Sequence, residues 1–176
     1  KTANLRMSGE QKVKEGDAVS RSVECSNKDE LLVFTSKHQV YKAKLDDFPD
    51  TKASVLGEYL PGKLEMEEEE TALYTAVISK YQGYMIFVFE NGKLAKVDLS
   101  AYETKTNRKK LINAFSDKSP LAAAVYLEED ADIVITSQAG RNLLINTAVI
   151  LPKTTKSTQG IQAMTLKKKS DKVISL

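Results

Sequence analysis

Basic residues recur at matching places along this chain, and their spacing is the first sign of chemistry. Lys42 and Lys44 are two residues apart, so on a β-strand their side chains would point to the same face. Lys96 takes the corresponding place in a second, similar stretch. Cationic groups spaced along a path can neutralise successive phosphates of a nucleic-acid backbone. The candidate phosphate-binding residues are Lys37, Lys42, Lys44, Lys52, Lys93, Lys96, Lys105, Arg108, Lys109, Lys110, Arg141, Lys153 and Lys156.

For any one of these residues the alternative is a solvated surface lysine, which is the commonest fate of that residue type. Recurrence at matching positions favours a shared role for the set. The third stretch is weaker, because Arg141 is followed by Asn142-Leu-Leu-Ile-Asn146 without a basic pair. Lys167–Lys169 and Lys172 form a further basic cluster that would either touch a polyanion or solvate a turn.

Residue patterns for catalysis or metal binding are lacking. His38 is the only histidine, and no serine or threonine has a partnered base to activate it. Glu65 and the run Glu67–Glu70 would repel one another rather than converge on one cation, so they predict a solvated, disorder-prone loop facing away from a bound polyanion. We expect no catalytic residue, no cofactor and no metal.

Three stretches share one pattern, an apolar run, a short polar turn and a second run with basic residues. They are Leu31–Leu45, Met85–Leu99 and, more loosely, Asp132–Thr147. Period-2 alternation with β-branched and aromatic residues predicts β-hairpins, and their repetition about every 50 residues predicts a radial or stacked array. Aromatic residues inside these runs are expected in the core rather than as base-stacking platforms, namely Tyr41, Tyr74, Tyr81, Tyr84, Phe87 and Phe89.

The hairpin turns differ in their residues. Asn91-Gly92 is a strong hairpin-turn dipeptide, and Ala139-Gly140 takes the same place in the third stretch. Lys37-His38 lacks a glycine, which predicts a longer or different turn in the first.

Each hairpin is followed by a polar connector and further short runs that read as strands. These runs are Thr71–Ile78, Leu111–Phe115, Leu121–Tyr126, Thr158–Leu166 and Lys172–Leu176. Met7–Val13 and Ala18–Val23 match the second half of a repeat whose first half is missing. The prediction is an all-β fold of repeated blade-like units, a partial array of about three to four, with repeats over 29–80, 81–128 and 129–176 after a half repeat over 1–28.

Composition is that of an ordinary globular protein. The 176 residues include 41% hydrophobic and 28% charged residues, with 26 Lys plus Arg against 24 Asp plus Glu. The resulting net charge of +2 excludes a uniformly basic surface but not a basic path. Cys25, the single cysteine, cannot form an internal disulfide and is expected to be a small, partly buried residue. No apolar stretch is long enough to span a bilayer, so we expect a soluble, cytoplasmic protein without a membrane partner. The first residue, Lys1, suggests a fragment of a longer chain.

Asp29–Leu45 resembles the repeat of the C-terminal region of the bacterial DNA gyrase and topoisomerase IV A subunits. In that family a blade reads apolar strand, Thr or Ser, small turn, then a strand with basic residues. Thr158-Gln-Gly-Ile161, followed by the charged turn and Lys172-Val-Ile-Ser175, is similar to the family's Thr-Gln-Gly segment and closing strand. The resemblance covers essentially the whole chain.

The resemblance implies a propeller-like β-pinwheel of repeated four-stranded blades, in which neighbouring blades exchange strands. It also implies a non-catalytic module that binds and wraps double-stranded DNA, within an ATP-dependent type IIA topoisomerase that includes an ATPase B subunit in addition to the rest of the A subunit, in a nucleoid-associated complex. The family's Gln-Arg-Arg-Gly-Gly-Lys-Gly box is absent from these residues, which leaves open gyrase, topoisomerase IV or a divergent paralogue. The family module usually has five or six blades, more than the repeats counted here.

A propeller-like scaffold for protein partners is the alternative from a different class, favoured by the near-neutral charge and the acidic run. Salt dependence of binding would separate the two, since phosphate binding weakens steeply with salt. If the recurrent lysines lie on the rim, changing Lys42, Lys44 and Lys96 to Ala should weaken DNA binding without altering the thermal midpoint.

Overall fold

One antiparallel hairpin forms the centre of each of three repeats in the computed structural model, which describes residues 1–2, 13–52 and 54–176. The hairpin strands are β1 (Glu30–Thr35) with β2 (Val40–Lys44), β4 (Tyr84–Phe89) with β5 (Lys93–Asp98), and β8 (Asp132–Ser137) with β9 (Asn142–Asn146). The predicted hairpins and the all-β fold class are confirmed.

A third strand pairs antiparallel with the first strand of every hairpin. These strands are β3 (Ala72–Ile78) on β1, β7 (Leu121–Leu127) on β4, and β11 (Val173–Ser175) on β8. The alanine-rich run at Leu121 is therefore a strand, as its place in the repeat predicted.

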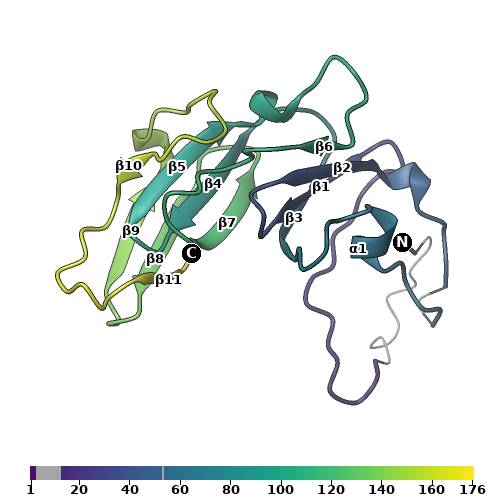
Figure 1. Ribbon diagram of the computed structural model, residues 1–176, viewed down its shortest axis with the longest axis horizontal. Coiled ribbons are helices and arrows are strands. Elements are labelled where there is room, and N and C mark those ends of the chain that lie inside the picture. Colours follow the sequence, from purple (N-terminus) through teal and green to yellow (C-terminus); the bar gives the residue numbers. More distant parts are fainter. Residues whose placement is uncertain (3–12, 53) are drawn as a thin grey trace.

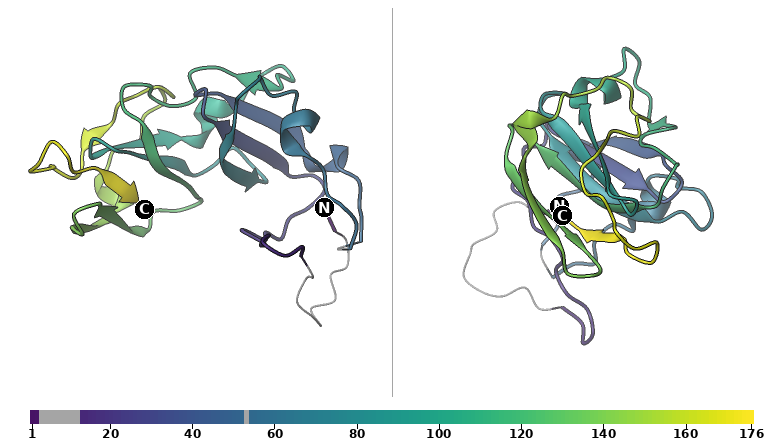
Figure 2. Two further views of the ribbon diagram at one scale, coloured as in Figure 1. Left: turned by 60° about the horizontal axis from the view of Figure 1, so that its bottom comes forward. Right: turned by 90° about the vertical axis from the view of Figure 1, so that its left-hand side faces the viewer.

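A fourth strand comes from the following repeat. β6 (Lys110–Leu111) pairs with β2, and β10 (Ile161–Gln162) pairs with β5, which gives the sheet orders β3-β1-β2-β6 and β10-β5-β4-β7. The third sheet, β11-β8-β9, has three strands among the described residues. The exchanged strands join successive sheets, which lie in a row along the long axis of the molecule (Figures 1 and 2).

Short helical turns follow the hairpins. The 3-10 helices η1 (Leu45–Asp47), η2 (Leu99–Tyr102) and η3 (Thr147–Val149) come directly after β2, β5 and β9, and α1 (Leu60–Lys63) is a single α-helical turn. The side chains of Asp98 and Asn146 cap η2 and η3 by accepting from backbone N–H groups two residues on. No helix in the described part of the chain has the length and apolarity needed to cross a membrane.

All three hairpin turns have the same form. His38, Gly92 and Gly140 take the equivalent place with φ of 56°, 84° and 80°, and each N–H donates to the carbonyl three residues earlier. The prediction of a different first turn is wrong, because His38 adopts the left-handed conformation without a glycine. Packing of its ring 4.8 Å from that of Phe115, and donation by Ala114 N–H to its carbonyl, hold it there.

The core lies mainly between the sheets. One cluster joins the first and second sheets through Phe34, Phe87 and Tyr102, with Phe34 in edge-on contact with both other rings at 5.5 and 5.4 Å. A second cluster, around Ile86 and Ile135, joins the second and third sheets. The outer face of the first sheet is covered by its own connector through a third cluster.

Residues 13–28 differ from the prediction. Ala18–Val23 has no regular secondary structure and is exposed. Arg21 crosses the edge of the first sheet, donates to the carbonyl of Thr75 and lies over the ring of Tyr74. Cys25 is exposed rather than partly buried. The strand expected over Met7–Val13 lies, up to residue 12, outside the described residues.

Gly160, in the Thr-Gln-Gly segment, lets β10 approach β5 closely. It has φ of 74°, and a Cβ built on it would lie 1.9 Å from the carbonyl oxygen of Leu94. Gly140 has a similar φ of 80° but open space around it. We therefore expect Gly160→Ala to lower the thermal midpoint more than Gly140→Ala, whose effect should be that of backbone strain alone, about 1 kcal/mol. Thermal unfolding followed by circular dichroism measures both, and equal midpoints for the two variants would contradict the close approach.

Candidate nucleic-acid interface

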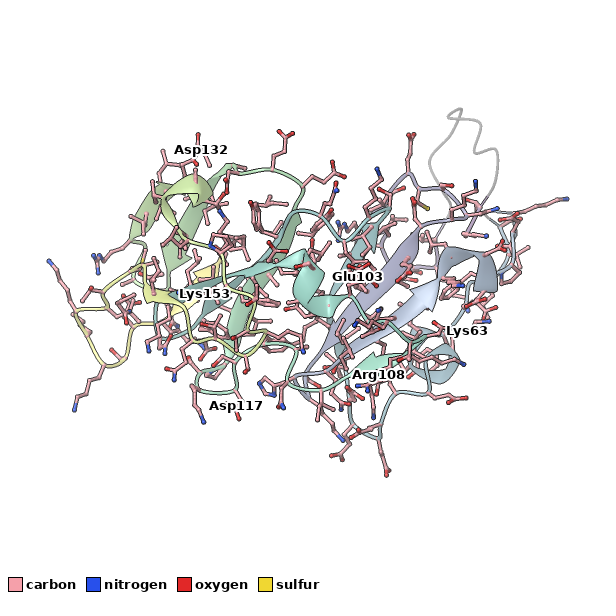
Figure 3. The ribbon with its side chains drawn as sticks, turned by 90° about the horizontal axis from the view of Figure 1, so that it is seen from above. Lys63, Glu103, Arg108, Asp117, Asp132 and Lys153 are labelled. Carbon is pink, nitrogen blue, oxygen red and sulfur yellow. The ribbon has the colours of Figure 1, made fainter. Side chains whose placement is uncertain are left out.

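Basic residues from the first and second repeats line one groove. The connector from η2 to β6 runs beside β2, where the N–H of Lys42 donates to the carbonyl of Lys109 at 2.8 Å. A groove of about 730 Å³ lies between this connector and the segment from η1 to α1. Its lining includes five lysines, Lys42, Lys44, Lys63, Lys105 and Lys109. Figure 3, which looks down on the side of the molecule where η2 lies, shows Lys63, Glu103 and Arg108 in this region and Lys153 over the neighbouring sheet.

Four carboxylates also line the groove, so its charge is mixed. Glu30 accepts from the hydroxyl of Tyr81 at 2.5 Å, and burial together with this carboxylate raises the pKa of Tyr81 well above its usual range. Asp47, Glu65 and Glu103 are exposed. Thr104, Thr106 and Asn107 add neutral hydrogen-bonding groups, which together with ammonium groups suit phosphate oxygens.

Lys42 is committed to the protein rather than free for a ligand. Its Nζ donates to the carbonyl of Tyr102 and to Thr104 Oγ1, both at 3.1 Å, and lies 4.9 Å from the ring centroid of Tyr81. Burial lowers the pKa of Lys42, while Glu30 and Glu103 oppose that shift. Lys42 therefore ties the connector after η2 to the first sheet.

Lys96 has the corresponding role in the second sheet. It is 3% exposed, and its Nζ lies 2.6 Å from Asp130 Oδ1 and 3.0 Å from the carbonyl of Thr147. The Lys96 ammonium, helped by the Thr147 hydroxyl, lowers the pKa of Asp130. The same ammonium lies over the ring of Tyr84, with Nζ 4.1 Å from the ring centroid.

The recurrence of Lys42 and Lys96 thus has a structural cause, since both lysines fasten a sheet to the 3-10 helix of the next repeat. Lys96 is not a rim residue, and the expectation that removing Lys42, Lys44 and Lys96 would leave the thermal midpoint unchanged is corrected. In the third repeat Leu144 occupies this place, exposed on β9.

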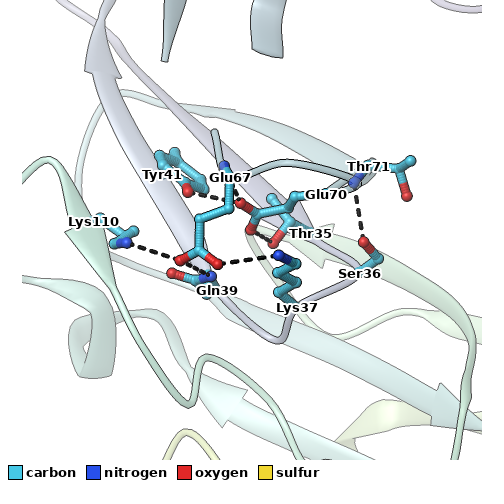
Figure 4. A network of polar contacts seen from close by, with 9 residues as sticks. All are labelled: Thr35, Ser36, Lys37, Gln39, Tyr41, Glu67, Glu70, Thr71 and Lys110. Atoms are coloured by element: carbon cyan, nitrogen blue, oxygen red, sulfur yellow. Dashed lines mark hydrogen bonds and ion pairs between the residues drawn. The ribbon is translucent and has the colours of Figure 1, made fainter. Parts of the chain in front are cut away.

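The acidic run is ordered and pairs with two of the candidate residues (Figure 4). Glu67 lies 3.2 Å from both Lys37 Nζ and Lys110 Nζ, and accepts from Gln39 Nε2 at 2.9 Å. Glu70 is buried and accepts from the Tyr41 hydroxyl at 2.8 Å, from the N–H of Glu67 at 2.9 Å, and from the hydroxyl of Thr35. The prediction of a solvated, disorder-prone loop is wrong, because Glu70 anchors the run inside the first sheet.

Because of these contacts, protonation of Glu67 at acid pH should lower the free energy of unfolding of the protein. Its three donors lower the pKa of this carboxyl from 4.5 to about 2 in the folded protein. A carboxyl with a lowered folded pKa stabilises above its unfolded value, and that contribution is lost as pH falls from about 4.5 towards 2. We expect the thermal midpoint of Glu67→Gln to decline less over that window than that of the wild type. Parallel declines, measured by calorimetry at a series of pH values, would contradict the pairing.

The remaining candidates divide into free and engaged residues. Lys93 donates to Gln159 Oε1 at 2.9 Å, Arg141 donates to the carbonyl of Thr165 at 2.7 Å, and Lys156 is half-buried. Six candidates are exposed and make no ion pair with any described residue, namely Lys44, Lys52, Lys105, Arg108, Lys109 and Lys153.

Recurrence persists in the connectors after the 3-10 helices. Lys105 and Arg108 follow the start of η2 at the same separations at which Lys153 and Lys156 follow the start of η3. Lys63 was missed from the sequence; it enters the groove because α1 folds back over the first sheet, and a four-residue turn containing Pro61 and Gly62 gives no pattern from which to predict this. Lys172, in the C-terminal basic cluster, pairs with Glu90 at 3.3 Å.

Aromatic residues lie where the sequence placed them. Tyr41, Phe87 and Phe89 are buried, while Tyr74, Tyr81 and Tyr84 are half-buried and engaged in contacts within the protein. Among the described residues no three His, Cys, Asp or Glu side chains are grouped to hold a metal ion. The groove therefore offers cations and neutral hydrogen-bonding groups beside its four carboxylates and, in the described part of the chain, no free aromatic platform, and its cations suit backbone phosphates rather than bases.

The family model of the DNA gyrase C-terminal domain, a beta-propeller, matches residues 29–54 and 131–176. The structure is similar to the C-terminal domain of DNA topoisomerase IV, with a TM-score of 0.78 and 21% identity over 94% of this chain and 51% of that one. The E. coli ParC C-terminal domain is also similar, with a TM-score of 0.69 and 16% identity over 92% of this chain and 66% of that one. This chain has the β-pinwheel fold of the C-terminal domains of gyrase and topoisomerase IV A subunits. The resemblance and fold class inferred from the sequence are confirmed.

Sequence relatives of this β-pinwheel are whole A subunits. The DNA gyrase A subunit of Mycobacterium tuberculosis (strain CDC 1551 / Oshkosh) is 26% identical over 155 residues, which are 86% of this chain and 18% of that protein. The DNA topoisomerase 4 A subunit of Staphylococcus epidermidis (strain ATCC 12228 / FDA PCI 1200) is 27% identical over 138 residues, 77% of this chain and 17% of that protein. The chain thus spans less than a fifth of the length of these relatives.

Proposed function

We propose that this β-pinwheel binds duplex DNA through the phosphate backbone and serves as the DNA-wrapping module of a type IIA topoisomerase A subunit. The observation that carries the proposal is the groove lined by the first and second repeats, where exposed Lys44, Lys105 and Lys109 meet on a fold shared with gyrase and topoisomerase IV A-subunit domains. Kinship with both kinds of A subunit supports the same role.

Contacts to phosphate suit a wrapping role, because neutralised phosphates release counterions regardless of base sequence. Bending a duplex of 20–30 bp costs on the order of 1–6 kcal/mol, which a series of such contacts offsets. The connectors of successive repeats provide that series, with Lys105 and Arg108 in one and Lys153 and Lys156 in the next. No base readout is required of this surface.

In the complete protein the module would act with an ATPase B subunit, in addition to the rest of the A subunit, in the bacterial cytoplasm. The chemistry of strand cleavage and ATP hydrolysis would lie in those other parts. This β-pinwheel would contribute by holding and bending the duplex and presenting it for passage.

The test is binding of the chain to a fluorescent linear duplex of roughly 40 bp, titrated at several salt concentrations. We expect sequence-tolerant binding whose affinity falls steeply between 50 and 200 mM salt, with a slope of about 0.9 per phosphate contacted. Absence of binding at the lowest salt would contradict the proposal and favour the protein-binding scaffold. A shallow salt dependence would equally exclude a phosphate-directed interface.

A further inference from the structure

We propose that the Glu67 carboxylate occupies a phosphate-binding seat formed by Lys37, Gln39 and Lys110, and that a backbone phosphate of DNA displaces it. The inference rests on the proposed function and adds a site outside the groove. It reassigns Lys37 and Lys110 from engaged residues to a preformed anion site that holds an internal ligand.

Three donors from different elements converge on this one carboxylate (Figure 4). Lys37 lies in the β1–β2 turn, Gln39 just before β2, and Lys110 on the exchanged strand β6. Their nitrogen atoms lie 2.9–3.2 Å from the Glu67 oxygens. A carboxylate and a phosphodiester both accept charge-assisted hydrogen bonds from ammonium groups, so a site built for one accepts the other.

Two of the three donors are supported by contacts other than that with Glu67. Gln39 is 6% exposed, and its Oε1 has no hydrogen-bond partner, so the amide has its donor end at the seat and gains nothing by reversing. Lys110 Nζ lies over the ring of Tyr41, 5.9 Å from its centroid, so this lysine has a contact besides Glu67. The seat is therefore held by packing as well as by Glu67.

Glu67 is free to move because the loop is anchored elsewhere. Its side chain is 45% exposed, similar to those of Lys37 and Lys110. Glu70, buried with three donors, fixes the loop, and the N–H of Glu67 is one of those donors. Rotation of the Glu67 side chain into solvent opens the seat without unfolding the loop.

The seat lies next to the groove along the connector. Lys110 follows Lys109, which lines the groove, so a duplex lying along the connector brings its phosphates past both. While Glu67 occupies the seat, its charge offsets those of Lys37 and Lys110, so bound DNA must compete with it. Glu67 would then set the affinity of this part of the path.

The first experiment compares duplex binding by Glu67→Ala and Glu67→Gln with Glu68→Ala and Glu68→Gln. Glu68 is the matched control, since it is exposed and makes no ion pair with any described residue. We expect Glu67→Ala to bind about tenfold more tightly at 50 mM salt, with a salt slope steeper by about one to two phosphates, and Glu68→Ala to change affinity by about twofold at most. The gain should vanish when Lys37 and Lys110 are also changed to Ala.

Equal gains for the Glu67 and Glu68 variants would show a general charge effect and overturn the inference. A Glu67→Ala variant with a lower thermal midpoint and unchanged affinity for the duplex would also overturn the inference, because that result is expected if Glu67 only stabilises the fold. Because Glu67→Gln keeps the side-chain shape, it separates loss of charge from loss of packing.

The second experiment needs no DNA, which makes its failure distinguishable from failure of the proposed function. Pyrophosphate is added to isotope-labelled wild type and Glu67→Ala, and the side-chain amide of Gln39 is followed by nuclear magnetic resonance. We expect saturable shifts in Glu67→Ala at concentrations at least fivefold below those needed in the wild type, as the emptied seat fills. No shift in Glu67→Ala overturns the seat, whereas shifts without a gain in duplex binding overturn its use by DNA.

Discussion

Lys96→Ala is expected to lower the thermal midpoint by about 6–12 °C, the shift that corresponds to about 3 kcal/mol in a domain of this size. Truncation removes a buried ammonium and its aliphatic stem, leaves a cavity beside Tyr84, and deprives the carbonyl of Thr147 of its donor. Asp130 would lose the partner that lowers its pKa. Differential scanning calorimetry measures the change.

Two variants control this prediction. Lys44→Ala, an exposed lysine in the first repeat, should leave the midpoint within about 1 °C of wild type, because surface lysines contribute little to stability. Lys96→Met keeps most of the stem and should recover part of the loss, since a buried ion pair is often replaceable by an apolar group. A midpoint unaffected by Lys96→Ala would show that the second and third sheets do not depend on this contact.

The largest expected effect on binding comes from changing Lys44, Lys105 and Lys109 together to Ala. These three lysines line the groove without ion-pair partners among the described residues. We expect affinity for a duplex to fall on the order of 100-fold at 50 mM salt and the salt slope to decrease by about three phosphate contacts. Fluorescence anisotropy at several salt concentrations gives both quantities.

Stability serves as the control for that triple variant, because none of the three side chains is buried. Its thermal midpoint should stay close to wild type, in contrast to any variant that includes Lys96. Wild-type affinity in the triple variant would remove the groove from the DNA path and leave the connectors around Lys153 as the remaining candidates.

Local patterns were sufficient for the strands. Period-2 alternation and the turn dipeptides located all three hairpins, and the place of Leu121–Leu127 in the repeat outweighed its alanine-rich composition. The first turn was misjudged because the left-handed conformation of His38 is stabilised by Phe115 and Ala114, which are far away in the sequence. The segment Ala18–Val23 was misjudged because its alternation is not matched by backbone pairing with the described strands: it is exposed, and its hydrogen bond to β3 comes from the side chain of Arg21.

The candidate site likewise combines features that the local sequence predicts with features that depend on tertiary contacts. The sequence located the basic residues and their recurrence, and repetition was enough to indicate blade-like units. It could not separate Lys96, which is buried against Asp130, from Lys44, which is exposed, because both occupy basic positions in strands of the same pattern. Nor could it show that Glu67 meets Lys37 and Lys110, since that contact depends on β6 crossing from the next repeat.

By itself, then, the sequence determined the all-β repeat and the hairpin boundaries, because these follow from short-range periodicity and turn chemistry. Only the tertiary structure decided which lysines face solvent, which tie one sheet to the next, and which are held by a carboxylate. The physical reason is that the free energy of a charged side chain depends on its burial and on partners brought together by strand exchange, and neither is encoded in the local pattern.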